Sequence, residues 1–240
     1  LATDASTGLE GLGYLKIQPN DPHGKFPSLL PELSGSESWN LLRYIMDTLR
    51  QKGACSYPDK ISVFDDFFAP RNRVYSFRKE VSCTTPSESI LAVCPAEGCT
   101  NKRAAFLQKL LQKMGYSEKE AQEKALGLLS YIATNLIPGI TKLFADLQDR
   151  ALGRRYQLNY RQWRISYLEE DAPVYRCKKC GKITTYSIHG CCPEMKCSGE
   201  LEQIPAGKAR KNVYYRQLLE NEKIIPMEAR EHTAQLSAQT

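Results

Sequence analysis

Four cysteines in the last third of the chain have the spacing of a metal site. Two residues separate Cys177 from Cys180, eleven follow, and four separate Cys192 from Cys197. Two such close pairs of thiolates can hold one tetrahedral zinc ion, and Gly181 can take the positive φ that a tight turn after the first pair requires. We therefore predict a zinc ribbon in which these four cysteines bind a structural Zn²⁺.

Two neighbours of Cys192 are alternative third ligands, namely Cys191 and His189. We favour Cys192 because Pro193 follows it in the Cys-Pro-x3-Cys arrangement usual for a metal-binding turn, and because four thiolates suit a closed structural site. Disulfide bonds are another interpretation of the same cysteines. The odd total of nine cysteines and the short spacing within the pairs favour a reduced compartment, so we predict a cytoplasmic protein.

The segments around the ligands predict a small β-structure. Residues 183–186 favour a strand, and residues 200–204 read as its partner. A module of about thirty residues has too little apolar surface to fold alone, so the metal would take the place of a core. Cys83, Cys94 and Cys99 are interpreted as buried thiols, because no second close pair accompanies them.

Positive charge is concentrated in the half of the chain that holds the cysteines. The whole chain has a net charge of +6, and residues 151–217 contain 13 Lys or Arg against 6 Asp or Glu, a surplus of 7. Such a local surplus is typical of a surface that binds a polyanion, of which nucleic acid is the commonest, although a solvated face has the same composition. The predicted phosphate contacts are Arg154, Arg155, Arg161, Arg164, Lys178, Lys179 and Lys182.

The preceding sequence is mainly helical in pattern. Ser34 and Ser117 each stand three residues before a glutamate, which predicts capping boxes that open helices over residues 34–53 and 117–135. Apolar spacing predicts further helices over residues 61–68, 101–114 and 140–151 and a short strand over residues 13–17.

Residues 154–158 and 163–168 alternate on either side of a short loop, which predicts a β-hairpin. Helices followed by a basic hairpin are typical of a winged-helix domain, so the expected fold class is α+β, mainly helical, with a four-cysteine zinc ribbon. The expected organisation is an irregular segment with a short strand over 1–35, a winged-helix-like domain over 36–170, the ribbon over 171–206, and a helix and tail over 207–240.

Other functions are disfavoured by what the sequence lacks. No apolar run is long enough to span a bilayer, so no membrane partner is expected. No glycine-rich loop has the pattern of a phosphate-binding P-loop, so this segment is expected to hydrolyse no ATP. The start at Leu1 instead of a methionine suggests processing or a piece of a longer protein.

Two stretches resemble a known family. Residues 231–236, Glu-His-Thr-Ala-Gln-Leu, resemble the segment that opens the second RecA-like lobe of superfamily 2 DEAD/DEAH-box helicases. Residues 156–201 are similar to the cysteine-bearing insert of some bacterial helicases of phage defence and DNA repair. The resemblance covers roughly residues 155–240, and because the ATP-binding and Asp-Glu motifs of the family are absent, it implies an accessory role.

The leading hypothesis is an accessory nucleic-acid-binding segment of an ATP-dependent DNA helicase or translocase. Its expected partners are duplex or single-stranded DNA and the RecA-like lobes of the parent enzyme. A zinc-stabilised module that docks a partner subunit is the alternative, and salt-dependent DNA binding would separate the two. An enzyme with a Cys or His nucleophile is disfavoured, because no catalytic constellation stands apart from the metal ligands.

Overall fold

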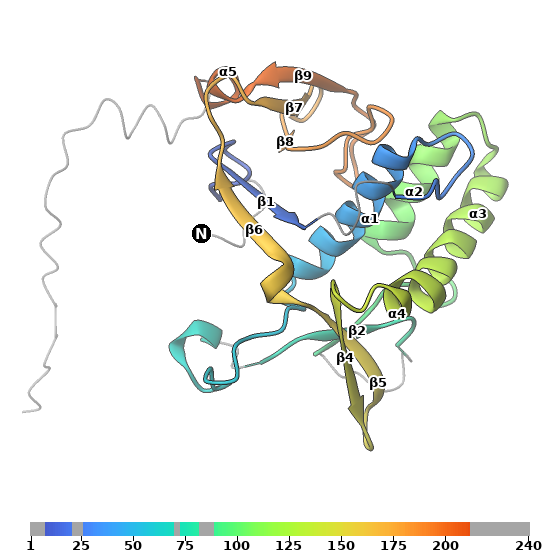
Figure 1. The fold of residues 1–240 in the computed structure, drawn as a ribbon. Helices are drawn as coiled ribbons and strands as arrows, with labels where there is room; N and C mark the ends of the chain where they lie inside the picture. The colour runs from blue at the N-terminus through green and yellow to red at the C-terminus, as the bar shows by residue number, and fades with distance from the viewer. Residues whose placement is uncertain (1–7, 21–25, 70–72, 82–88, 212–240) are drawn as a thin grey trace, which may run out of the picture.

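The computed structural model describes residues 8–20, 26–69, 73–81 and 89–211. Its longer helices lie together on the right of the view, and its strands lie above them, to their left and below them (Figure 1). The strands of this part of the chain form three separate sheets, of two, four and three strands. The fold is therefore mixed α/β, and the prediction of a mainly helical protein is wrong.

The helices with local start signals lie where the sequence predicts them. Ser34 and Glu37 form the capping box of α1 (Gly35–Arg50), and Ser117 and Glu120 form that of α3 (Glu118–Tyr131). Asn101 caps α2 (Lys102–Lys113). A π-helical turn (Ile132–Leu136) and the short α4 (Ile137–Gly139) continue α3, whereas the predicted helix over 61–68 is reduced to a 3-10 turn, Asp66–Phe68.

The predicted helix over residues 140–151 is wrong, because much of it forms a strand. The four-stranded sheet has the order β3 (Ile90–Ala92), β2 (Ser76–Arg78), β5 (Gly153–Leu158) and β4 (Phe144–Asp149). Strand β4 runs antiparallel to β5 over its whole length, from Phe144 opposite Leu158 to Asp149 opposite Gly153. Gly153 has φ +70°, which suits the turn of this hairpin.

The predicted hairpin of residues 154–158 with 163–168 does not form. Strand β6 (Trp163–Tyr167) pairs instead with β1 (Leu15–Pro19), the predicted N-terminal strand, in an antiparallel two-stranded sheet. A 3-10 turn, Tyr160–Gln162, separates β5 from β6 and leads the chain from one sheet to the other. The wing of the predicted winged-helix domain is therefore absent from this part of the structure, and that interpretation is wrong.

The third sheet carries the cysteines, and its order is β8 (Ile183–Thr184), β7 (Pro173–Cys177) and β9 (Leu201–Pro205). Both predicted strands are present, but β7 lies between them and pairs with each. Helix α5 (Ala206–Lys211) follows β9. Cys177 is thus the last residue of the central strand.

The main hydrophobic core joins the helices to the four-stranded sheet. Helices α1 and α2 contribute the fully buried Leu41, Leu42, Leu107 and Leu110, and the four-stranded sheet contributes Phe77 and Leu158. Ile188 and Cys191, which belong to the segment with the cysteines, are buried in the same core. A smaller core lies under the third sheet and consists of Leu168, Val174, Ile204, Ala206 and Ala209.

Candidate metal centre

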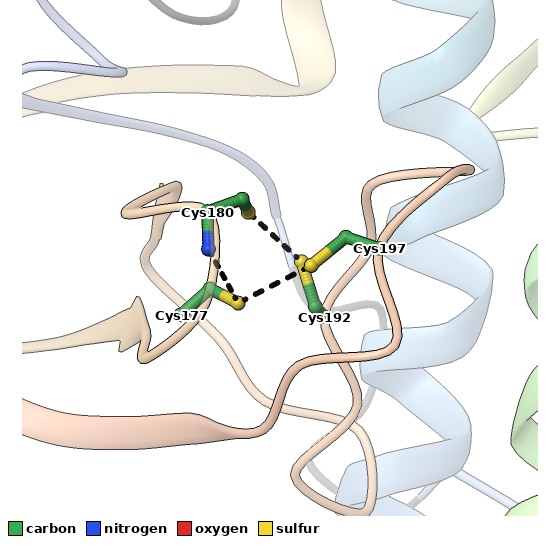
Figure 2. A group of neighbouring side chains, drawn as sticks. All are labelled: Cys177, Cys180, Cys192 and Cys197. Atoms are coloured by element: carbon green, nitrogen blue, oxygen red, sulfur yellow. Dashed lines mark hydrogen bonds between the residues drawn. The ribbon is translucent and has the colours of Figure 1, made fainter.

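Figure 2 shows that the four cysteines predicted from their spacing converge on one point. Their Sγ atoms all lie within 4.8 Å of one another, and the pairs Cys177–Cys197 and Cys180–Cys192 are each 3.6 Å apart. A tetrahedral ion with Zn–S bonds of about 2.3 Å places its sulfurs about 3.8 Å apart, so the four sulfurs fit around one such ion. A disulfide would need about 2.05 Å, and these thiols are free.

Two tight turns present the sulfurs. Gly181 has φ +74° in the first turn, and the backbone N–H of Cys180 donates to Cys177 Sγ at 3.5 Å. In the second turn the N–H groups of Glu194 and Gly199 donate to the sulfurs of Cys192 and Cys197, at 3.4 and 3.3 Å. Backbone N–H groups aimed at sulfur favour the thiolate, which is the form that binds metal.

The pKa values of Cys177 and Cys192 are shifted in opposite directions. Burial raises the pKa of Cys177, but hydrogen bonds from the backbone of Cys180 and Lys179 and from the thiols of Cys180 and Cys192 together outweigh it and bring that pKa to about 7. Burial raises the pKa of Cys192 well above its ordinary value, with neighbouring thiols adding to the rise. Four thiolates this close require a cation to offset their repulsion, so the arrangement can hold a metal ion in place of the thiol protons.

The two alternative ligands lie outside the cluster. Cys191 is buried in the main core, where burial raises its pKa, and its backbone forms a bridge to Glu200. His189 is exposed, with φ 47°, and its backbone N–H donates to Glu37 Oε1 at 3.1 Å. The structure thus brings together the favoured set of ligands and neither alternative.

The remaining cysteines in the predictions have different surroundings. Cys94 is buried, as the sequence predicts, but Cys99 is exposed, so the interpretation of both as buried thiols is wrong for Cys99. Cys83 lies outside the described residues.

Lys109 of α2 binds the second turn and was not predicted. Its Nζ donates to the carbonyl oxygens of Cys192, Glu194 and Cys197, at 2.5, 2.9 and 2.8 Å. In the sequence Lys109 stands between Phe106 and Leu110 on an amphipathic helix, and nothing in the neighbouring residues indicates partners more than eighty positions away. The metal centre is therefore attached directly to the helices.

Helix α1 binds the segment between the two turns. Asn40 Nδ2 donates to the carbonyl of Ser187 at 3.1 Å, and Arg43 donates to Thr185 Oγ1 at 2.6 Å. The Tyr186 hydroxyl donates to Asp47 at 3.1 Å, and burial raises the pKa of Tyr186 well above its ordinary value. These contacts fix the third sheet against α1, so the cysteine segment and the helices share one polar interface.

The seven predicted phosphate contacts do not form one surface. Arg154 forms an ion pair with Asp146 at 2.7 Å, and Lys182 forms one with Glu194 at 2.8 Å. Arg155 is half-buried and donates to Ser76 Oγ at 3.3 Å. The hairpin of β4 and β5 lies at the opposite end of the molecule from the third sheet (Figure 1). The exposed members of the set are Arg154, Arg161, Arg164, Lys178 and Lys179.

The absence of a side chain at Gly199 leaves room for the sulfur atoms to lie close to one another. A Cβ on Gly199 would lie 2.5 Å from Cys177 Sγ and 2.7 Å from Lys179 Cβ, whereas a Cβ on Gly127 of α3 would meet nothing within 4 Å. We expect Gly199→Ala to weaken metal binding about 10- to 100-fold, in the range of other changes beside metal ligands, and Gly127→Ala to leave it unchanged. Competition with a chromogenic chelator measures both, and equal affinities would contradict the prediction.

No match was found for this chain among protein-family models, curated proteins or solved structures. Within the described ranges, no helix combines the length and the apolar character needed to cross a membrane.

Proposed function

We propose that this chain is a zinc-stabilised accessory segment of an ATP-dependent superfamily 2 DNA helicase or translocase, and that it contacts nucleic acid beside its metal centre. The observation that carries the proposal is the cluster of four thiols within 4.8 Å, with two exposed lysines in its first turn. The resemblance of residues 156–201 and 231–236 to bacterial helicases of phage defence and repair supports the choice of parent enzyme.

Zinc is the metal that this donor set favours. A tetrahedral set of four sulfurs is typical of zinc or of iron–sulfur centres, and four protein ligands leave a single zinc ion no open position for a substrate. Three of the four cysteines are buried. The ion would therefore have a structural role and would supply part of the folding free energy of the surrounding segment.

The first turn is the proposed site of nucleic-acid contact. Lys178 and Lys179 lie between Cys177 and Cys180 and are exposed, and neither forms an ion pair within the described part of the chain. Lys179 donates to Ser198 Oγ at 3.1 Å, which leaves its charge uncompensated. Lysines on a rigid turn can bind phosphates without reading bases. Arg161 and Arg164, which are exposed beside and within β6, would add a second, separate contact.

A charge reversal in this turn tests the proposal. We expect Lys178→Glu with Lys179→Glu to weaken duplex binding at least about 10-fold at low salt, for all sequences alike. Because each lost phosphate contact reduces the slope of log K against log salt by about 0.9, the slope should become shallower by about 2. Fluorescence anisotropy at several salt concentrations measures both quantities.

The control changes the same charge elsewhere. Lys119→Glu with Lys124→Glu alters two exposed lysines of α3, outside both metal-binding turns, and should leave affinity and slope nearly unchanged. Metal content should stay at that of the wild type in both double variants. Equal losses in the two would show that only net charge matters, and the proposed site would then be wrong.

A second candidate function is a module that docks a partner subunit, and the two-stranded sheet favours it. Ile165 and Tyr167 of β6 are 69% and 57% exposed, and their neighbours across the sheet are Ile17 and Leu15. An exposed apolar face of this kind marks interaction surfaces. If the wild-type chain binds no DNA at low salt, this candidate is favoured. Ile165→Ser should then weaken co-purification with the RecA-like lobes of the parent enzyme.

A further inference from the structure

We propose that Lys109 is a positioning residue of the metal centre, which shapes the second turn for the ion and offsets the negative charge of the loaded site. This inference rests on the proposed metal site. It adds a specific role for a residue that lies outside the ribbon. Helix α2 would then increase the affinity of the site for its metal ion through this lysine.

The geometry uses the whole hydrogen-bonding capacity of the lysine. An ammonium group has three N–H donors, and Lys109 Nζ has three carbonyl acceptors, on Cys192, Glu194 and Cys197. Two of these carbonyls belong to metal ligands themselves. Because three convergent bonds fix the path of the backbone between Cys192 and Cys197, they favour the separation of the two sulfurs that the loaded site requires.

The charge of the ammonium gives it a preference for the loaded site. Four thiolates around a divalent ion have a net charge of −2, whereas four protonated thiols are neutral. A half-buried ammonium that binds the backbone of two ligands attracts the first arrangement more strongly than the second. An interaction raises the affinity for an ion only when it is stronger in the bound state than in the free state. The attraction of the Lys109 ammonium meets this condition, because only the loaded site is negatively charged.

The helix provides a rigid base for this contact. Leu107 and Leu110, on either side of Lys109, are fully buried in the main core. The ammonium also lies 5.6 Å from the centre of the Phe106 ring, within the range of a cation–π contact. Helix α2 therefore presents the lysine to the second turn from a rigid base.

The same helix provides a matched control. Lys113, one turn after Lys109, also reaches the ribbon, but through an ion pair of 3.2 Å with Glu200, whose side chain is 64% exposed. Such surface pairs contribute little, so its removal should have a small effect. Lys109→Met and Lys113→Met remove the same charge from neighbouring positions, and only the first removes hydrogen bonds to the ligand backbone.

The experiment measures the dissociation of zinc from the purified full chain into excess chelator. We expect Lys109→Met to weaken zinc binding about 10- to 100-fold, largely through faster dissociation, and Lys113→Met to change it less than about 3-fold. Lys109→Gln, which keeps two donors without the charge, should fall between Lys109→Met and the wild type. If Lys109→Met does not fold, Lys109→Gln takes its place in the comparison with Lys113→Met.

A second readout separates positioning from general packing. The midpoint of thermal unfolding is measured with zinc and after chelation, and we expect Lys109→Met to lower the midpoint mainly in the zinc-loaded form. Equal decreases in both forms, or zinc dissociation equal to that of Lys113→Met, would overturn the assignment of Lys109. If the wild type binds no zinc at all, the proposed metal site itself fails.

Discussion

Cys192→Ser is expected to abolish tight metal binding and to unfold the third sheet. The smaller core under this sheet holds five buried residues, too few to fold a segment of this size alone. A structural zinc ion contributes on the order of 10–16 kcal/mol in zinc-finger peptides, so its loss exceeds what that core can offset. Metal content by mass spectrometry and hydrogen exchange of residues 173–205 should both report the loss.

Cys191→Ser is the matched control for this prediction. Cys191 is the adjacent cysteine, also buried, but its side chain packs in the main core and lies outside the cluster of sulfurs. We expect this variant to keep one metal ion per chain and to lose only a modest amount of stability. Metal retained by Cys192→Ser and lost by Cys191→Ser would show that the choice of third ligand is wrong.

Loss of the metal should also reach the helices. Ile188, between the two turns, is 2% exposed in the main core, and Tyr186 donates to Asp47 of α1. Unfolding of the cysteine segment would remove Ile188 from the main core and Tyr186 from α1, so the free energy of unfolding of the helices should fall as well. This connection explains why four ligands in one segment can influence a much larger part of the chain.

Features that depend on neighbouring residues could be predicted from the sequence. Ser34 with Glu37 and Ser117 with Glu120 satisfy backbone N–H groups within one turn, so those helices begin where the pattern indicates. The four metal ligands could be predicted for the same reason, because each pair of cysteines is presented by one short turn whose residues are adjacent in the sequence. In both cases the signal and its structural consequence lie within a few residues of each other.

Strand partners could not be predicted in this way. Residues 140, 143, 144 and 147 are apolar with helical spacing, yet Phe144 and Leu147 lie in β4 because pairing with β5 outweighs local preference. Strand β6 follows β5 closely, but its partner is β1, nearly 150 positions earlier. Nothing in the alternation of residues 154–168 distinguishes a hairpin from two strands that enter different sheets.

The count of basic residues also overestimated the available surface. Arg154, Arg176 and Lys182 form ion pairs with Asp146, Glu202 and Glu194, which compensates their charge. Arg210 is 2% exposed and so cannot serve as a phosphate contact on the surface. A surplus of charge in the sequence gives no information on which cations are compensated by carboxylates distant in the chain.

Arg210→Met is expected to be strongly destabilising although Arg210 lies outside the metal centre. The guanidinium donates to the carbonyl of Gly13 at 3.0 Å, to the Tyr167 hydroxyl at 3.0 Å and to the carbonyl of Leu168. Its central carbon lies 4.8 Å from the ring centre of Tyr14 and 5.1 Å from that of Tyr167. This one side chain thus connects α5 to the residues just before β1 and to the end of β6.

The expected loss follows from the number of bonds broken. Hydrogen bonds from a charged donor contribute about 1.5–3 kcal/mol each, and removing the donor leaves two carbonyls beside the sheet, those of Gly13 and Leu168, without it. Because neighbouring contributions do not add fully, we expect a loss of about 3–5 kcal/mol in the free energy of unfolding. A two-stranded sheet is marginal by itself, so hydrogen exchange of β1 and β6 should accelerate in the variant.

The adjacent Lys211→Met removes the same charge from an exposed position of α5 and should change the free energy of unfolding by less than about 0.5 kcal/mol. Urea denaturation of both variants in the presence of zinc makes the comparison, since zinc keeps the third sheet folded in each. If the midpoints of Arg210→Met and Lys211→Met coincide, Arg210 does not hold α5 to the sheet. The rigidity of β1 and β6 must then come from Leu168, Val174 and the rest of the smaller core.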